Sequence, residues 1–189
     1  MRRSAGALTV VLALGALVPA CASSRADSPR CASKDDPWIL VAQAVPSATY
    51  LPCMRTLPTG WTVTGSRVER GSYSAWLDSD RAGVHALRVA LTPTCDVSDA
   101  VEIPVPDAPR GVRTYEQPIS LPPSFSADRF LTFAGGCITY EFRFSMPAPA
   151  TAALEVRQAL GVRPREDVRR ALAQIGLTLC GAGAPPCPG

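Results

Sequence analysis

His85 is the one histidine in the 189 residues, so the sequence offers a single imidazole for acid–base or metal chemistry. A Ser-His-Asp triad would need that imidazole beside an activated serine. The chain contains no G-x-S-x-G motif, because residues 71–75 (GSYSA) lack the final glycine. His85 alternates with Leu87, Val89 and Leu91 along one apolar face of a predicted strand. We therefore predict a buried or half-buried structural histidine.

Asp78 and Asp80 could together bind a cation, and with Gly83 they resemble part of a calcium-binding loop. The bidentate acid that completes an EF-hand loop is missing, because its position is taken by Val89. Residues 78–83 (DSDRAG) separate two apolar runs, which is typical of a hairpin turn. We predict a hairpin loop here, and a catalytic role for these acids or for His85 is the alternative.

Arginines are concentrated near the C-terminus, where acidic residues lie between them. The arginines are Arg157, Arg163, Arg165, Arg169 and Arg170, and the acids are Glu155, Glu166 and Asp167. We predict a solvated face with ion pairs, and the alternative is a surface for anionic partners or lipid headgroups. The sequence contains neither a phosphate-binding glycine loop nor a dinucleotide-binding fingerprint.

The seven cysteines are Cys21, Cys31, Cys53, Cys95, Cys137, Cys180 and Cys187. With no C-x-x-C pair and one histidine, the sequence argues against a zinc site, and we expect neither a metal nor another cofactor. Lipidation of Cys21, or cleavage after Ala22, would leave an even number, which is typical of disulfides in an oxidising compartment. Sequence alone does not choose among the many pairings. We favour neighbours in chain order: Cys31–Cys53, Cys95–Cys137 and Cys180–Cys187.

The first residues of the chain indicate the compartment in which these cysteines reside. Arg2 and Arg3 precede an apolar run at residues 5–18, and small residues lead to Cys21. This order is typical of a bacterial export signal. The run of about 16 apolar residues is shorter than the roughly 20 that cross a bilayer as a helix. An uncleaved anchor is therefore the least favoured of three interpretations, behind lipidation at Cys21 and ordinary cleavage after Ala22.

Residues 18–21 (VPAC) resemble a lipobox, and the first 21 residues resemble the signal peptides of bacterial lipoproteins. Pro19 departs from the usual pattern, which prefers a small or β-branched residue. The resemblance implies that Cys21 becomes the N-terminus and carries acyl chains such as palmitate. Several such chains would hold the protein at the outer face of the cytoplasmic membrane. Cleavage after Ala22 would instead give a secreted protein.

The composition argues against a nucleic-acid partner. Without Arg2 and Arg3 the 19 basic residues fall to 17, against 16 acidic ones, so the mature chain is nearly neutral. Lys34 is the only lysine, and the abundance of Arg, Ala, Pro and Gly resembles that of proteins from G+C-rich genomes such as those of actinobacteria. The partners we expect are the membrane, through the lipid anchor, and another envelope protein.

We predict one domain at residues 37–189, joined to the signal (residues 1–21) by a flexible tether at residues 22–36. About 165 residues follow the signal, which is enough for one core. The patterns predict the α+β class, with an antiparallel sheet of about four or five strands. A short N-terminal helix and two C-terminal helices are expected to pack on this sheet.

The expected elements follow from apolar periodicity. We predict helices at residues 38–45, 151–160 and 164–175, and strands at 61–68, 72–77, 84–91, 129–133, 138–145 and 177–179. Residues 96–124 are rich in proline and are expected to form a long surface connection, with an edge strand at 112–116 as the alternative.

No motif in residues 37–189 assigns an activity. We predict a non-enzymatic binding or accessory domain that acts outside the cytoplasmic membrane. The alternative is a cell-envelope hydrolase with a site near His85 or the Asp78/Asp80 pair. A purely structural secreted domain is a third hypothesis.

Overall fold

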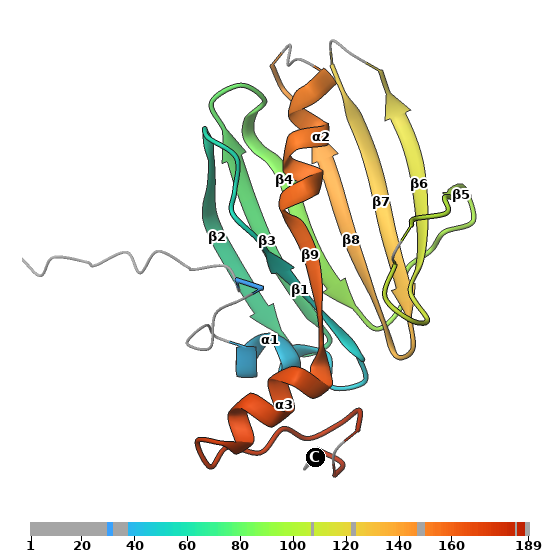
Figure 1. The fold of residues 1–189 in the computed structure, drawn as a ribbon. Helices are drawn as coiled ribbons and strands as arrows, with labels where there is room; N and C mark the ends of the chain where they lie inside the picture. The colour runs from blue at the N-terminus through green and yellow to red at the C-terminus, as the bar shows by residue number, and fades with distance from the viewer. Residues whose placement is uncertain are drawn as a thin grey trace, which may run out of the picture.

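The computed structural model describes residues 30–31, 38–106, 108–121, 124–146, 150–183 and 185–187. The predicted signal, the predicted lipidation site Cys21 and most of the predicted tether lie outside these residues. The described chain has the α+β character that the sequence predicts, although strands predominate (Figure 1).

The main sheet has seven antiparallel strands in the order β2-β3-β4-β8-β7-β6-β5. Their bounds are β2 (Trp61–Glu69), β3 (Ser72–Ser79), β4 (Gly83–Thr92), β8 (Gly136–Arg143), β7 (Ser126–Phe133), β6 (Arg113–Ser120) and β5 (Val101–Glu102). The prediction of four or five strands was therefore wrong. The additional strands β5 and β6 lie in the proline-rich segment that we assigned to a surface connection. Pro118 is tolerated in β6 because β5 pairs only with Tyr115 and Glu116, so that part of β6 has an open edge.

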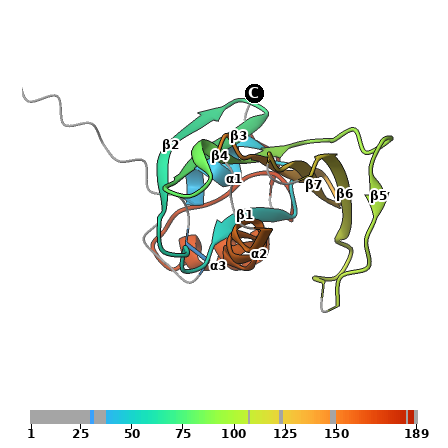
Figure 2. The ribbon, with the colours of Figure 1, turned by 90° about the horizontal axis from the view of Figure 1, so that it is seen from above.

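A separate two-stranded sheet pairs β1 (Tyr50–Met54) with β9 (Leu160–Pro164) in antiparallel register. In Figure 2 the main sheet curves, and β1, α2 and α3 lie on one side of it. The sequence analysis extended a helix through Leu160 to Gly161, but α2 (Ala150–Ala159) ends one residue earlier and the chain continues as β9. The main-chain N–H of Arg55 donates to Ala159 O (2.7 Å), at the point where α2 meets β9.

The helices differ in what they cover. α1 (Trp38–Ala44) confirms the predicted short helix, and its buried face includes Trp38 and Val41. α3 (Arg165–Ala173) contacts α1 and β9, so its predicted packing on the main sheet was wrong. The predicted strand at residues 177–179 is not formed. There the chain passes from α3 to the last cysteine loop, with Leu179 buried and Leu177 exposed.

The core lies between the curved sheet and the elements on its inner side. Leu91 and Phe142 of the sheet belong to one buried cluster with Leu51 of β1 and Val156 of α2, and each of the four is fully buried or nearly so. The alternation predicted for residues 138–144 is confirmed, since Ile138, Tyr140, Phe142 and Phe144 are all buried. These residues place β8 at the centre of the sheet.

Three disulfides join Cys31–Cys53, Cys95–Cys137 and Cys180–Cys187. This is the chain-order pairing that the sequence analysis favoured. Disulfides of this kind indicate an oxidising, extracytoplasmic environment. In the described part of the chain, none of the helices combines the length and apolar character needed to span a bilayer.

Candidate ligand pocket

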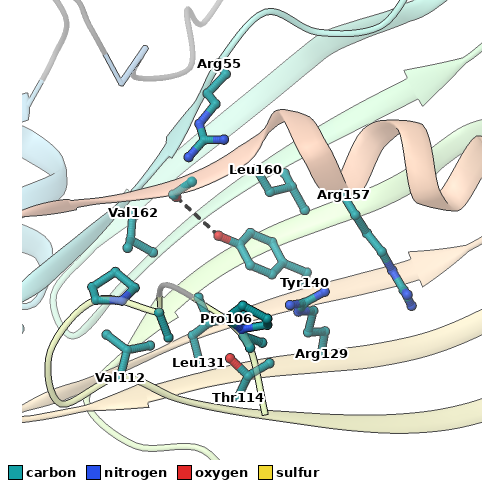
Figure 3. Close-up of a pocket in the computed structure, with 14 residues that line it drawn as sticks. Arg55, Pro106, Val112, Thr114, Arg129, Leu131, Tyr140, Arg157, Leu160 and Val162 are labelled. Atoms are coloured by element: carbon teal, nitrogen blue, oxygen red, sulfur yellow. Dashed lines mark hydrogen bonds between the residues drawn. The ribbon is translucent and has the colours of Figure 1, made fainter. Parts of the chain in front are cut away.

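A cavity of about 330 Å³ lies between the main sheet and the β9 strand (Figure 3). Strands β6, β7 and β8 supply its sheet side, and the end of α2 with β9 supplies the opposite side. Residues 105–106 and 108–112 of the proline-rich connection form a further wall. The volume is at the lower end of the range for small-molecule sites.

Apolar side chains form one part of the lining. Val105, Pro106 and Val112 come from the proline-rich connection, and Leu131 and Val162 come from β7 and β9. Turns fix the connection, with the Val112 N–H donating to Pro109 O (3.0 Å). The Tyr50 hydroxyl of β1 donates to Arg110 O (3.0 Å), which ties the connection to the two-stranded sheet. This part of the pocket can accommodate an apolar group without leaving a buried polar atom unpaired.

Tyr140 lies at the centre of the pocket in Figure 3, and its hydroxyl donates to Gly161 O across the cavity (3.3 Å). The side chain is 2% exposed, and burial raises the pKa of its hydroxyl. Tyr140 is therefore neutral at physiological pH. A side chain at Gly161 would lie 2.9 Å from Cys31 Sγ, so the close approach of β9 to the disulfide depends on glycine.

Three arginines, Arg55, Arg129 and Arg157, contribute positive charge to the lining. The guanidinium groups of Arg129 and Arg157 both approach Glu116 Oε1, at 3.4 and 3.3 Å. No ion pair to Arg55 is formed by any residue that the structure describes. Since Glu116 is one carboxylate beside three guanidinium groups, the local charge is positive.

The Arg157 side chain is 23% exposed, as is that of Arg129, whereas Arg55 is exposed. Its guanidinium carbon lies 5.2 Å from the centre of the Phe142 ring, and its Nε is buried without a hydrogen-bond partner. Burial lowers the pKa of the guanidinium, while the charge of Glu116 opposes that shift. Arginine nevertheless stays charged in proteins, so the pocket holds a partly desolvated cation.

This arrangement is suited to binding. The described lining residues include no carboxylate, histidine or cysteine. Elsewhere in the described part of the chain, no group of three or more histidine, cysteine or acidic side chains is placed to hold a metal ion.

The structure places His85 on the surface, so the prediction of a buried or half-buried histidine was wrong. The β3–β4 register passes from Leu77 opposite Leu87 to Ser79 opposite Gly83, which leaves a bulge at residues 84–86. The His85 N–H donates to Asp78 Oδ1 (2.7 Å), and the His85 φ of 49° is left-handed. The bulge interrupts the alternation on which the prediction rested.

The acids singled out in the sequence lie in and beside the predicted hairpin turn. Asp78 belongs to β3 and also accepts a hydrogen bond from Thr64 Oγ1 (3.3 Å). Asp80 is exposed in the turn, 3.9 Å from Arg81 Nε. Neither acid lines the pocket, and neither does His85.

The C-terminal arginines do not share one solvated face. Arg169 and Arg170 form the expected ion pairs with Glu166 and Asp167. Arg165 is instead 2% exposed. Arg163 and Arg157 belong to other elements: Arg163 lies over the Trp38 ring (5.1 Å), and Arg157 lines the pocket. The predicted helices at residues 151–160 and 164–175 placed the five arginines on two neighbouring helices, but residues 160–164 form β9 between α2 and α3.

Sequence reasoning did not identify this pocket. Tyr140 was assigned correctly to a core face, but Arg55, Arg129 and Thr114 carried no local motif. They are brought together by long-range strand pairing.

Comparison with known proteins adds little to this description. No family model and no curated protein matches the sequence. A solved structure of a protein from Bacteroides thetaiotaomicron VPI-5482 is similar with a TM-score of 0.32 and 14% sequence identity. The match covers 64% of this chain and 47% of that one, so the chain spans about half of that protein's length. A likeness of this size assigns neither a fold family nor a function.

Proposed function

We propose that the protein is exported as a lipoprotein, anchored through Cys21 at the outer face of the cytoplasmic membrane, and binds a small molecule without chemically changing it. The bound molecule occupies the pocket beside Tyr140 and has an apolar body. The observation that carries this proposal is the pocket itself, in which apolar walls surround a few convergent polar groups. The three disulfides support the extracytoplasmic location.

The hydrolase alternative receives less support. His85 and Asp80 are exposed and lie outside the pocket lining. The buried hydroxyl of Tyr140 has a raised pKa, which makes it a poor base or nucleophile at neutral pH. A binding role needs only the polar and apolar groups that the pocket presents.

Binding can be tested with N-phenyl-1-naphthylamine, a neutral apolar dye whose fluorescence increases when it leaves water. We expect saturable binding to the processed, oxidised protein. Val162→Phe places extra volume in the pocket and should weaken dye binding at least tenfold. Ile119→Phe adds a similar ring at an exposed position of β6 that does not line the pocket, and it should leave binding unchanged. Equal binding by both variants would contradict the proposed site.

Anchoring can be tested in cells. Labelled palmitate should be incorporated into the native protein and not into a Cys21→Ser variant. The variant should also appear in the soluble fraction outside the cytoplasmic membrane, or keep its uncleaved signal. Equal labelling of both proteins would show that Cys21 is not the lipidated residue.

A further inference from the structure

The pocket has an apolar part and a part with positive charge, and together they limit the chemical class of ligand that it can bind. Val112 and Val162 lie at one end of the view in Figure 3, whereas Arg157 lies at the other end and Arg129 lies below Tyr140. Arg55 approaches from above. A neutral apolar ligand would use the first part of the pocket and leave Glu116 as the carboxylate that Arg129 and Arg157 share.

Among the residues that the structure describes, the carboxylate that the two inner arginines share is a weak partner for both. Arg129 and Arg157 share one oxygen of Glu116, at 3.4 and 3.3 Å, which is longer than a normal charged hydrogen bond. Arg157 also has a buried Nε without a partner. Guanidinium groups bind carboxylate and phosphate oxygens with two parallel hydrogen bonds, so an anionic oxygen pair would supply what Glu116 does not.

The cavity volume limits the length of the apolar part. At about 30 Å³ for each water-sized group, the pocket holds roughly eleven such groups. This is close to the size of a ten-carbon acyl chain with its head group. A full phospholipid would extend well beyond the described walls.

We propose that the pocket binds a medium-chain anionic amphiphile, with its carboxylate or phosphate head at Arg157 and Arg129 and its chain against the walls formed by Val105, Pro106, Val112 and β9. This inference rests on the proposed function and names the chemical class of its ligand. Arg55, which is exposed, provides further positive charge beside the pocket. Glu116 acts as the internal counter-ion that the incoming head group displaces.

Displacement of N-phenyl-1-naphthylamine by matched competitors tests the charge of the head group. Decanoate and decanol have the same chain length and differ in charge, and inorganic phosphate is an anion without a chain. We expect decanoate to compete at least tenfold better than decanol, and phosphate alone to compete poorly. Equal competition by decanoate and decanol would overturn the anionic head, and displacement by phosphate at decanoate concentrations would overturn the amphiphile.

Substitutions identify the residues that make this discrimination. Arg157→Gln should reduce the preference for decanoate over decanol about tenfold, and an unchanged circular dichroism spectrum shows that the variant is still folded. Glu116→Gln should act in the opposite direction and strengthen decanoate binding severalfold. Arg67→Gln is the matched control, because Arg67 pairs with Glu69 on β2 and does not line the pocket. A preference that survives Arg157→Gln, or weaker decanoate binding after Glu116→Gln, would contradict the proposed head-group site.

The two proposals fail in different ways. If the dye does not bind the native protein, or binds Val162→Phe equally well, the binding site itself is wrong. If the dye binds in the pocket and is displaced equally by decanoate and decanol, only the anionic ligand class is wrong. If decanoate displaces the dye better than decanol, octyl phosphate in place of decanoate distinguishes a phosphate head from a carboxylate head by the same displacement.

Discussion

Arg165 connects three separate parts of the chain, and its replacement by methionine should destabilise the protein strongly. Its Nη1 donates to Ala42 O in α1 (2.5 Å), and its Nη2 donates to Cys180 O beside the last disulfide (2.6 Å). Its main-chain N–H donates to Thr49 O (2.8 Å). The Ala42 carbonyl belongs to the last turn of α1, where carbonyl groups have no partner within the helix.

The expected loss follows from these contacts. Each hydrogen bond to a charged group contributes about 1.5–3 kcal/mol, and both acceptors lose their donor in Arg165→Met. The methionine keeps part of the apolar packing, and it removes a guanidinium that pairs with no carboxylate among the residues described. We therefore expect a net loss of about 3 kcal/mol in the free energy of unfolding. For a chain of this size that corresponds to a melting temperature lower by roughly 6–12 °C.

Urea unfolding of the oxidised protein, followed by tryptophan fluorescence, measures this loss. Arg169→Met on the same helix is the matched control, because the Arg169 side chain is 39% exposed and, among the residues that the structure describes, its ion pair is with Glu166. The control should unfold at the same urea concentration as the native protein. Arg165→Lys keeps the charge but reaches fewer acceptors, so its stability should lie between those of the native protein and Arg165→Met. If Arg165→Met unfolded with the native free energy, the reasoning from these two carbonyl contacts would be refuted.

Three further predictions concern other parts of the molecule. Replacing both cysteines of Cys95–Cys137 by serine should cost about 4 kcal/mol, and doing the same to Cys180–Cys187 about 2 kcal/mol, because the closed segments span 42 and 7 residues. Urea unfolding checks this order, and the reverse order would contradict it. His85→Gly should stabilise the protein by about 0.5–1 kcal/mol, because φ is 49° at His85 and only glycine adopts such angles without cost. A melting temperature of the His85→Gly variant below that of the native protein would argue against the bulge. The hydrogen bond from Arg113 lowers the pKa of the Glu102 carboxyl below its ordinary 4.5. The pair therefore stabilises the folded protein fully above pH 4.5, and this stabilisation is lost as the pH falls through the lowered pKa of Glu102. An NMR titration of the Glu102 carboxyl should show this shift, and Arg113→Gln should return the pKa towards 4.5.

The parts of the fold that the sequence predicted are those with local periodic signals. β8 was recognisable because apolar and polar side chains alternate from Ile138 to Phe144, and α1 because Trp38 and Val41 share a helical face. β6 was not predicted as a full strand because Pro118 argues against one. Pro118 lies at an open edge, and this depends on the tertiary structure rather than on the local sequence. β9 was missed because Leu160 and Pro164 were assigned to the ends of two predicted helices, with residues 161–163 between them, and only pairing with β1 makes these residues a strand.

The pocket could not be predicted for the same reason. Arg55, Arg129 and Arg157 are separated by long stretches of chain, and each is unremarkable in its own segment. Only the pairing of β6 with β7 and of β1 with β9 brings their elements into one lining. His85 shows the converse case. The local pattern was regular and predicted a buried side chain, but a three-residue bulge places His85 on the surface.

The β1–β9 pairing also orders the events of folding. Tyr50 pairs with Pro164 and Met54 with Leu160, so contacts between distant positions complete the wall opposite the sheet. Such pairings carry a high cost in loop-closure entropy and form late. In a chain that emerges from its N-terminus, the hairpin of β2 and β3 can form long before β9 is present. A chain truncated before Leu160 would therefore retain much of the sheet and have no binding cavity.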